Sequence, residues 1–211
     1  MTILSSAQAI IKGRLGNFTS TSLDAPIITE MAQAQTVMEE GDFKPWFLLT
    51  ESSTALNAIN EERLPVPTDF IMEWEEGALS WKEQTATVWI DLTKEDYDFL
   101  RGRYDPTGSP KGYALAGENF LIVPEPIAIY NWKMRYYAKQ PANANPTDEN
   151  VWLKYASDWL IAETGLIIAN SYVRDKKAAD QFAAQKSEAK ARLEKHNVAK
   201  AEANRERMMG E

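Results

Sequence analysis

The side chains able to carry acid–base chemistry occur mainly as adjacent carboxylates, at Glu39/Glu40, Glu61/Glu62 and Glu75/Glu76. A glycosidase needs two carboxylates that converge across a cleft, and the side chains of sequence neighbours usually diverge. These pairs therefore do not predict an acid–base active site.

The chain has few of the residues that nucleophilic catalysis and metal binding usually need. The chain has no cysteine and a single histidine, His196, which lies in a charge-rich helical pattern typical of an exposed position. Thiolate zinc sites, disulfides and cysteine nucleophiles are excluded, and a Ser-His-Asp triad is not indicated. Gly13 and Gly16 are not followed by the Lys-Ser/Thr of a phosphate-binding loop. We predict a protein that is not an enzyme, with no metal site and no cofactor.

The charge is unevenly distributed along the 211 residues. Residues 176–211 hold nine Lys/Arg against six Asp/Glu, whereas residues 1–175 hold fourteen against twenty-five. An acidic body argues against wrapping DNA, because phosphates are neutralised by basic surface. The N-terminus lacks the pattern of a signal peptide, and no window has the apolar length of a membrane span. We therefore expect a soluble cytosolic protein with no membrane contact.

The predicted elements fall into three segments. Residues 1–42 form an N-terminal helical segment with a short helix over Ser6–Leu15 and a second helix that begins at an Asp24 cap. Pro26 suits the first turn of this second helix, and Gly41 suits its C-terminal stop.

Residues 43–143 read as an antiparallel β-domain, because alternating segments follow one another with short turns. The pattern predicts strands over 46–50, 85–92 and 128–136, a hairpin of 113–116 with 120–123, and a short helix over 94–103 capped by Thr93.

Residues 144–211 predict a long C-terminal helix. Trp152, Tyr155, Trp159, Ala162, Leu166, Ala169 and Val173 follow spacings of three and four. About 60 helical residues would extend about 90 Å, which is more than this chain can bury. We expect a division at about Asp175, with an aromatic first half in the core and an alanine-rich charged half that another protein completes. The predicted fold class is α+β, with the long C-terminal helix packing on the N-terminal helices.

The order of several segments resembles the head-to-tail adaptor (connector) proteins of tailed bacteriophages. The resemblance covers roughly residues 1–205. It is carried by a Leu-Pro-x-Asp-Phe step that follows the first strands, a Gly-x-Pro-x-x-Tyr segment, a strand ending in Pro-x-Pro, and an aromatic helix. The corresponding segments are Arg63–Ile71, Gly108–Tyr113, Asn119–Pro126, Met134–Ala138, Asn145–Thr147 and Trp152–Arg174.

The resemblance implies a structural virion protein at the head–tail junction, assembled in the host cytoplasm. Such adaptors form oligomeric rings, commonly dodecameric, beneath the portal after DNA packaging. They extend the DNA channel, through which DNA passes without specific binding, and present a platform for the tail or nozzle protein. In relatives the C-terminal segment commonly reaches into the portal, which would supply the long helix with its partner.

The resemblance places portal-binding residues in the C-terminal helix. Phe182 and Leu193 are the large apolar groups on an otherwise alanine-lined face, Met208 and Met209 are adaptable apolar tips, and Arg205 and Arg207 can pair with acidic groups. A solvated helix face is the alternative interpretation for each of them.

Two other functions fit the sequence. One is a tail-tube or tail-completion subunit that never touches the portal. The other is a β-domain ligand-binding or carbohydrate-binding module with a helical oligomerisation tail, which predicts an exposed tryptophan platform around Trp74, Trp81 or Trp89.

Overall fold

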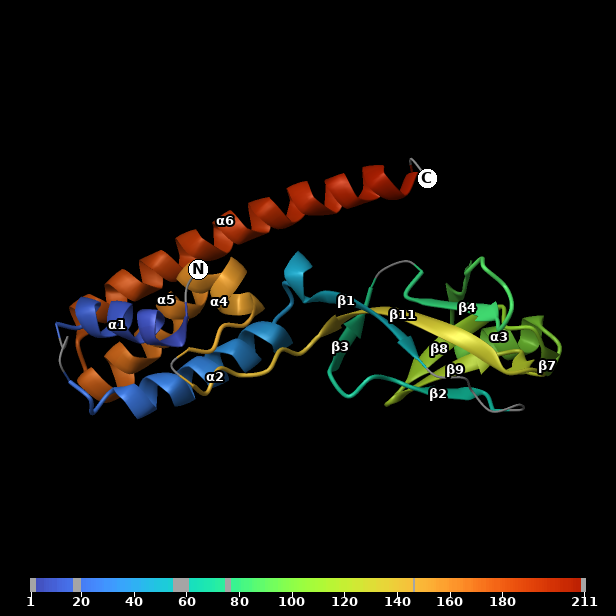
Figure 1. Ribbon diagram of the computed structural model, residues 1–211, viewed down its shortest axis with the longest axis horizontal. Helices are drawn as coiled ribbons and strands as arrows, with labels where there is room; N and C mark the ends of the chain where they lie inside the picture. The colour runs from blue at the N-terminus through green and yellow to red at the C-terminus, as the bar shows by residue number, and fades with distance from the viewer. Residues whose placement is uncertain (1–2, 17–19, 55–60, 75–76, 146, 210–211) are drawn as a thin grey trace. The chain divides into compact units, whose positions relative to one another are not determined.

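The computed structural model describes residues 3–16, 20–54, 61–74, 77–145 and 147–209, with the side chains of residue 54 and residues 201–209 left undescribed. Two compact units share the chain (Figure 1). We call them the helical unit, Met1–Leu48 with Lys139–Glu211, and the β unit, Leu49–Ala138. The predicted α+β class, with N-terminal helices, an antiparallel-dominated sheet region and a long C-terminal helix, is confirmed.

Helix α5 is the centre of the helical unit, because it contacts α1, α2, α4 and α6. Its sequence is the most apolar of the helices, and Leu160, Ala162 and Ile168 are fully buried. Among the described helices, none has both the length and the apolar content needed to cross a membrane. The elements of this unit are α1 (Leu4–Arg14), α2 (Asp24–Glu40), the 3₁₀ turn η1 (Trp46–Leu48), α4 (Val151–Tyr155), α5 (Ser157–Ile168), the π-helical turn η2 (Ala169–Val173) and α6 (Lys176–Met209).

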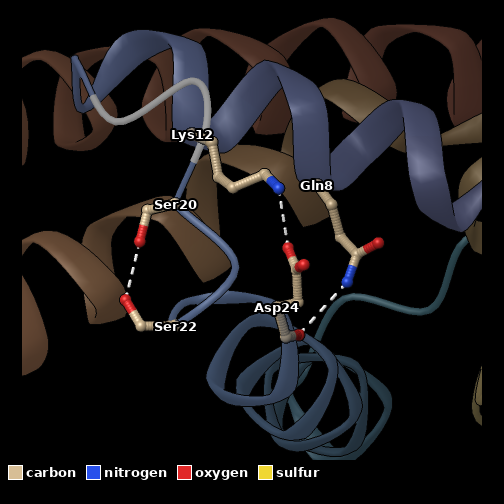
Figure 2. Close-up of polar contacts among 5 residues, drawn as sticks. All are labelled: Gln8, Lys12, Ser20, Ser22 and Asp24. Atoms are coloured by element: carbon tan, nitrogen blue, oxygen red, sulfur yellow. Dashed lines mark hydrogen bonds and ion pairs between the residues drawn. The ribbon is translucent and has the colours of Figure 1, made fainter.

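Asp24 joins α1 to α2. Its carboxylate pairs with the Lys12 ammonium at 2.7 Å, and its carbonyl accepts a hydrogen bond from the Gln8 side chain at 3.1 Å (Figure 2). The prediction that Asp24 is the N-cap is wrong by one position, because Leu23 occupies the cap and Asp24 is the first helical residue. Gly41 is the C-cap of α2, as predicted.

The prediction of one uninterrupted C-terminal helix is wrong. Helical hydrogen bonding is irregular at Ala156, and the chain leaves the helix at Arg174, whose backbone is left-handed (φ 58°, ψ 40°). The position of the division agrees with the expectation of a change near Asp175. At that point the chain forms a helical hairpin, α5 followed by α6.

The β unit has two main sheets. One has the strand order β1-β11-β4-β5 with β3 also paired to β11, the other has the order β2-β9-β8-β6, and β10 pairs with β7. Their bounds are β1 (Leu49–Thr54), β2 (Arg63–Pro65), β3 (Phe70–Glu73), β4 (Leu79–Glu83), β5 (Ile90–Asp91), β6 (Thr93–Lys94), β7 (Thr107–Gly108), β8 (Gly112–Ala116), β9 (Asn119–Val123), β10 (Glu125–Pro126) and β11 (Tyr130–Ala138), with α3 (Tyr97–Arg103) between β6 and β7.

Strand β11 supplies the centre of the β-unit core. Every second residue from Tyr130 to Ala138 is buried, as the alternation predicts, and Trp132 has no exposed surface. The two sheets are joined by the buried Tyr113 hydroxyl, which donates to the Glu73 carboxylate at 2.8 Å. Burial raises the pKa of Tyr113 to about 12, so this phenol stays protonated as a donor.

The structure tests the hairpin, the strand and the short helix that the sequence predicts for the β unit. The β8–β9 hairpin is confirmed, with Gly117 at φ +60° in its turn. The strand predicted over 85–92 is wrong apart from β5, since Val88 lies 70% exposed. The predicted helix after residue 94 begins at Tyr97, and its cap is Asp96, whose carboxylate accepts from the backbone N–H groups of Asp98 and Phe99.

A buried carboxylate holds the point where the chain returns from the β unit. Glu39, 4% exposed in α2, accepts hydrogen bonds from the Trp152 indole (2.8 Å), the Gln140 backbone N–H (3.1 Å) and the Gln35 amide (3.1 Å). Burial raises the pKa of Glu39 above its usual 4.5, and the three hydrogen bonds partly oppose that shift. Glu39 therefore fixes α2, α4 and the incoming chain together.

We predict that Glu39→Gln changes the pH dependence of stability. The pKa of Glu39 is higher in the folded state than in the unfolded chain. The stability that the protonated Glu39 contributes is therefore present in full below about pH 4.5 and is lost as pH rises through the folded pKa. Glutamine keeps an acceptor for Trp152 without a charge, so the variant should gain stability relative to the wild type as pH rises. Urea unfolding from pH 4 to pH 7 measures this, with exposed Glu40→Gln as the control. Parallel profiles for all three proteins would contradict the prediction.

Candidate functional site

The α5–α6 hairpin depends on a defined reversal. The π-helical turn η2 ends at Arg174, and the Asp175 backbone N–H donates to the Ala169 carbonyl at 3.0 Å. The Asp175 carboxylate then accepts from the Ala178 N–H at 3.0 Å, which caps the first turn of α6. A side-chain cap and a left-handed residue thus stop one helix and start the next.

The two helices approach closely at Gly165. A Cβ atom at this position would overlap the ring of Phe182, which is 1% exposed. Phe182 is predicted from the sequence to bind the portal, and in the structure its ring packs against α5 within the chain. In this conformation the ring has no surface left for a partner.

Polar contacts align α6 with the rest of the helical unit. Lys186 pairs with Glu163 at 2.7 Å, and Arg192 pairs with Asp158 at 3.2 Å. The Arg192–Asp158 pair is exposed, and such pairs contribute about 0–1 kcal/mol. The spacing of the two ion pairs shows that α6 runs antiparallel to α5.

The last described side-chain contacts of α6 are with η1 and the segment before it. The Trp46 backbone N–H donates to the Asn197 side-chain oxygen at 2.6 Å, and the Asn197 amide reaches the Lys44 carbonyl at 3.4 Å. The Lys200 ammonium lies 5.4 Å from the centre of the Trp46 ring. Beyond Lys200 the helix continues to Met209.

A hollow of about 500 Å³ lies beside this contact, and we call it the aromatic groove. Trp46 and Tyr155 form its aromatic wall, with ring centroids 5.0 Å apart. Asp158 is the one carboxylate among the described lining residues, and it is paired with Arg192. The groove is lined by Trp46, Tyr155, Ala156, Ser157, Asp158, Trp159, Ala189, Arg192, Leu193, His196 and Lys200.

The described contacts of α6 are packing contacts within the helical unit. The model of the family described as SU10 adaptor protein matches residues 2–209. The chain belongs to the SU10 adaptor protein family. The predicted resemblance to phage head-to-tail adaptors is thereby confirmed. A comparison with curated proteins gave no match.

In this SU10 adaptor family member, two of the acidic candidates hold contacts within the chain. Glu39 is the buried acceptor described above, and Glu62 accepts from the Tyr97 hydroxyl at 2.9 Å. Glu75 and Glu76 lie outside the described residues. Within the described part of the chain, no group of three His, Asp or Glu side chains is arranged to hold a metal ion.

The residues predicted for portal binding are separated by the structure into two sets. Phe182 is core, and Leu193, 9% exposed, is part of the wall of the aromatic groove. Arg205, Arg207, Met208 and Met209 lie in the last turns of α6, and their side chains are outside the described residues.

Sequence patterns missed the residues that fix the end of α6. The apolar stripe predicts a buried Tyr155, but this residue is 43% exposed and ends α4, directly before the irregular backbone at Ala156. Asn197 has no periodic signal, since its partner is a backbone N–H 151 residues away in the sequence. Asp175, by contrast, was detectable as a capping residue that directly precedes an alanine-rich helix.

Of the three tryptophans predicted for the platform of a carbohydrate-binding module, Trp74 and Trp89 are half-buried. Trp81 is 4% exposed, and so it is a core residue of the β unit. The Arg135 guanidinium lies 5.7 Å from the centre of the Trp74 ring. Trp89 lies near the Lys82 and Lys133 ammonium groups, at 4.9 and 5.0 Å.

We predict that Gly165→Ala destabilises the helical unit although alanine favours helix. The gain in helix propensity is about 1 kcal/mol, whereas overpacking a buried contact costs about 1–3 kcal/mol. Phe182→Leu should cost stability alone but lower the cost of Gly165→Ala in the double variant. A double-mutant cycle by urea unfolding measures the coupling, and Gly102→Ala is the control because nothing surrounds that glycine in the exposed helix α3. If the changes in the free energy of unfolding caused by the two substitutions simply add in the double variant, the close contact is contradicted.

Proposed function

We propose that this SU10 adaptor family member is a structural virion subunit that forms a ring beneath the portal, extends the DNA channel and presents the attachment platform for the tail. The match of the family model over residues 2–209 carries the proposal. The role requires no chemistry of bond making or breaking, and it is met by rigid surfaces that several neighbours can bind.

The charge distribution supports a channel through which DNA slides without binding. The β unit holds fifteen Asp/Glu against eight Lys/Arg, so it contributes −7 of the chain's formal charge of −8. Binding to DNA requires cationic groups that replace phosphate counterions. An acidic subunit instead repels the duplex and lowers non-specific attachment.

The end of α6 supports a portal contact. Lys200 is the last residue of α6 with a described side-chain contact, and the nine residues after it, 201–209, extend the helix by about 14 Å at 1.5 Å per residue. This segment contains Arg205, Arg207, Met208 and Met209, which combine cationic and adaptable apolar groups. We propose that this segment, rather than the buried Phe182, meets the portal.

We predict that deleting residues 201–211 abolishes binding to the portal and leaves the fold intact. The deletion keeps Asn197 and Lys200 against Trp46, so the groove and the hairpin should form as in the full chain. Electron microscopy of portal rings mixed with each protein measures the binding, and circular dichroism checks the fold. A full chain with Lys176→Ala and Lys177→Ala, at the opposite end of α6, is the control.

Two results would contradict the proposal. Normal decoration of portal rings by the shortened chain would remove the role assigned to residues 201–211. Failure of the full chain to bind portal rings, together with binding to a tail protein, would favour a tail-completion subunit instead.

A further inference from the structure

We propose that neighbouring subunits join through their sheets, with strand β1 of one copy paired to residues 87–91, at the β5 edge, of a second copy. The inference rests on the proposed ring, since it names the contact between neighbouring subunits. Both segments belong to the sheet with the order β1-β11-β4-β5, in which β1 and β5 are the two outer strands.

Strand β1 has an open side. The Arg135 backbone N–H donates to the Ala78 carbonyl at 2.7 Å, so the backbone groups of Arg135 face away from β1. Glu51 lies directly opposite Arg135, and in an antiparallel pair such opposite residues either bond to each other or both face away. The N–H and C=O groups of Glu51 and Ser53 therefore point outward. Within the described residues, no backbone hydrogen bond from another element reaches this side of β1.

The sheet is open at β5 in the same way. The Leu92 N–H donates to the Leu79 carbonyl of β4 at 2.9 Å. Since backbone direction alternates along a strand, Ile90 also faces β4, and the backbone groups of Trp89 and Asp91 point outward. The described part of the chain supplies no backbone partner on that side. An open edge of this kind is a template for pairing with another chain.

The β5 edge also carries apolar side chains that a single chain leaves in solvent. Val88 is 70% exposed and Ile90 is 49% exposed. The alternation over residues 85–92 is typical of a half-buried strand, yet only Ile90 and Asp91 form β5. Soluble proteins usually protect an edge with lysine, proline or a bulge, whereas this edge presents apolar groups. A neighbouring strand would cover them.

The core faces of the two edges coincide. Ile90 lies opposite the buried Trp81, so its side chain is on the core face of the sheet. Ser52 of β1 lies opposite the buried Met134, on the same face. Three antiparallel pairings separate β1 from β5, so these strands run in opposite directions. Copies placed side by side therefore meet as an antiparallel pair that continues the sheet without inverting it.

Backbone direction and charge also select a register. Pairing Trp89 with Glu51 of the neighbour brings outward backbone groups together and sets Val88 opposite Ser52 on the core face. The Lys82 ammonium lies 4.9 Å from the centre of the Trp89 ring, so a cation is beside the position that the neighbour's carboxylate takes.

Pairings between identical edges are less favourable. The self-pairing of β1 that uses the outward groups of residues 49, 51 and 53 sets two Glu51 carboxylates directly opposite, which is destabilising. Pairing β5 with β5 joins two chains and leaves β1 open in both. Pairing β1 with β5 fills both edges of every copy, and a heterologous contact of this kind gives a closed ring when its rotation closes.

The cysteine-free chain allows a direct test by disulfide formation. One preparation carries Val88→Cys and a second carries Ser52→Cys. In the proposed register this is a non-hydrogen-bonded pair with Cα atoms about 4.5 Å apart, which a disulfide can span. After mixing and mild oxidation, we expect a covalent heterodimer in excess over a control mixture of Val88→Cys with Ser53→Cys, because Ser53 is on the opposite face. Each variant oxidised alone reports the pairing of identical edges.

Substitutions at the two edges test the same contact without cysteine. Ser53→Pro removes an outward N–H and keeps the pairing with β11. It should weaken self-association in sedimentation about fivefold, the effect of one hydrogen bond, whereas Ser53→Ala keeps the N–H and should match the wild type. Val88→Ser should weaken association about tenfold through lost apolar burial. Val37→Ser, at a 63% exposed position of α2, is its control, and circular dichroism checks each fold.

The outcomes separate this contact from the proposed function. A heterodimer yield equal to that of the Ser53→Cys control, or association unchanged by both Ser53→Pro and Val88→Ser, would overturn the edge-to-edge contact. Predominant dimers of Val88→Cys alone or Ser52→Cys alone would also overturn it, since identical edges would then pair. Portal binding by the unmodified chain is measured in parallel and judges the adaptor role independently. Rings on the portal without the heterodimer retain the adaptor role and reject this interface, and the heterodimer without portal binding does the reverse.

Discussion

The contact between Gly165 and Phe182 is the constraint on which the helical unit depends. Without a Cβ at residue 165, α6 approaches α5 closely enough for Phe182 to be buried, and the alanines at 178, 179 and 189 continue this close packing. The antiparallel alignment then brings Arg192 to Asp158 and Asn197 to η1. The aromatic groove exists because this alignment holds the distal half of α6 beside Tyr155.

Within the helical unit, Glu39 contacts both the segment that precedes the β unit in the sequence and the segment that follows it. The Lys44 ammonium donates to the Glu39 carbonyl at 2.6 Å on the outgoing side, and the Gln140 N–H donates to the Glu39 carboxylate on the returning side. Glu39, near the C-terminal end of α2, therefore binds both of these segments. The β unit has its own core, built on β11, so each unit buries its own apolar residues.

These features agree with a protein whose function is assembly. The polar groups of the interior are used to join elements, as at Glu39 and at the Tyr113–Glu73 hydrogen bond. The surfaces that remain for partners are of different kinds: an acidic β unit, an aromatic groove, and the end of α6. The proposed function, in which one subunit contacts neighbours, portal and tail, needs such distinct surfaces, because identical ones would not select between partners.

The sequence by itself determined the class of the fold, the β8–β9 hairpin and the buried face of β11, because these depend on local periodicity and turn residues. The family was indicated by the resemblance of its ordered motifs to those of phage adaptors. The sequence also located the change of character at Asp175, where a capping residue precedes an alanine-rich helix. Only the tertiary structure decided that the chain reverses there, that Phe182 is core and that Tyr155 faces a groove. Those outcomes depend on Gly165 and Asn197 meeting residues distant in the sequence, and periodicity within one segment carries no information about the surface that it meets.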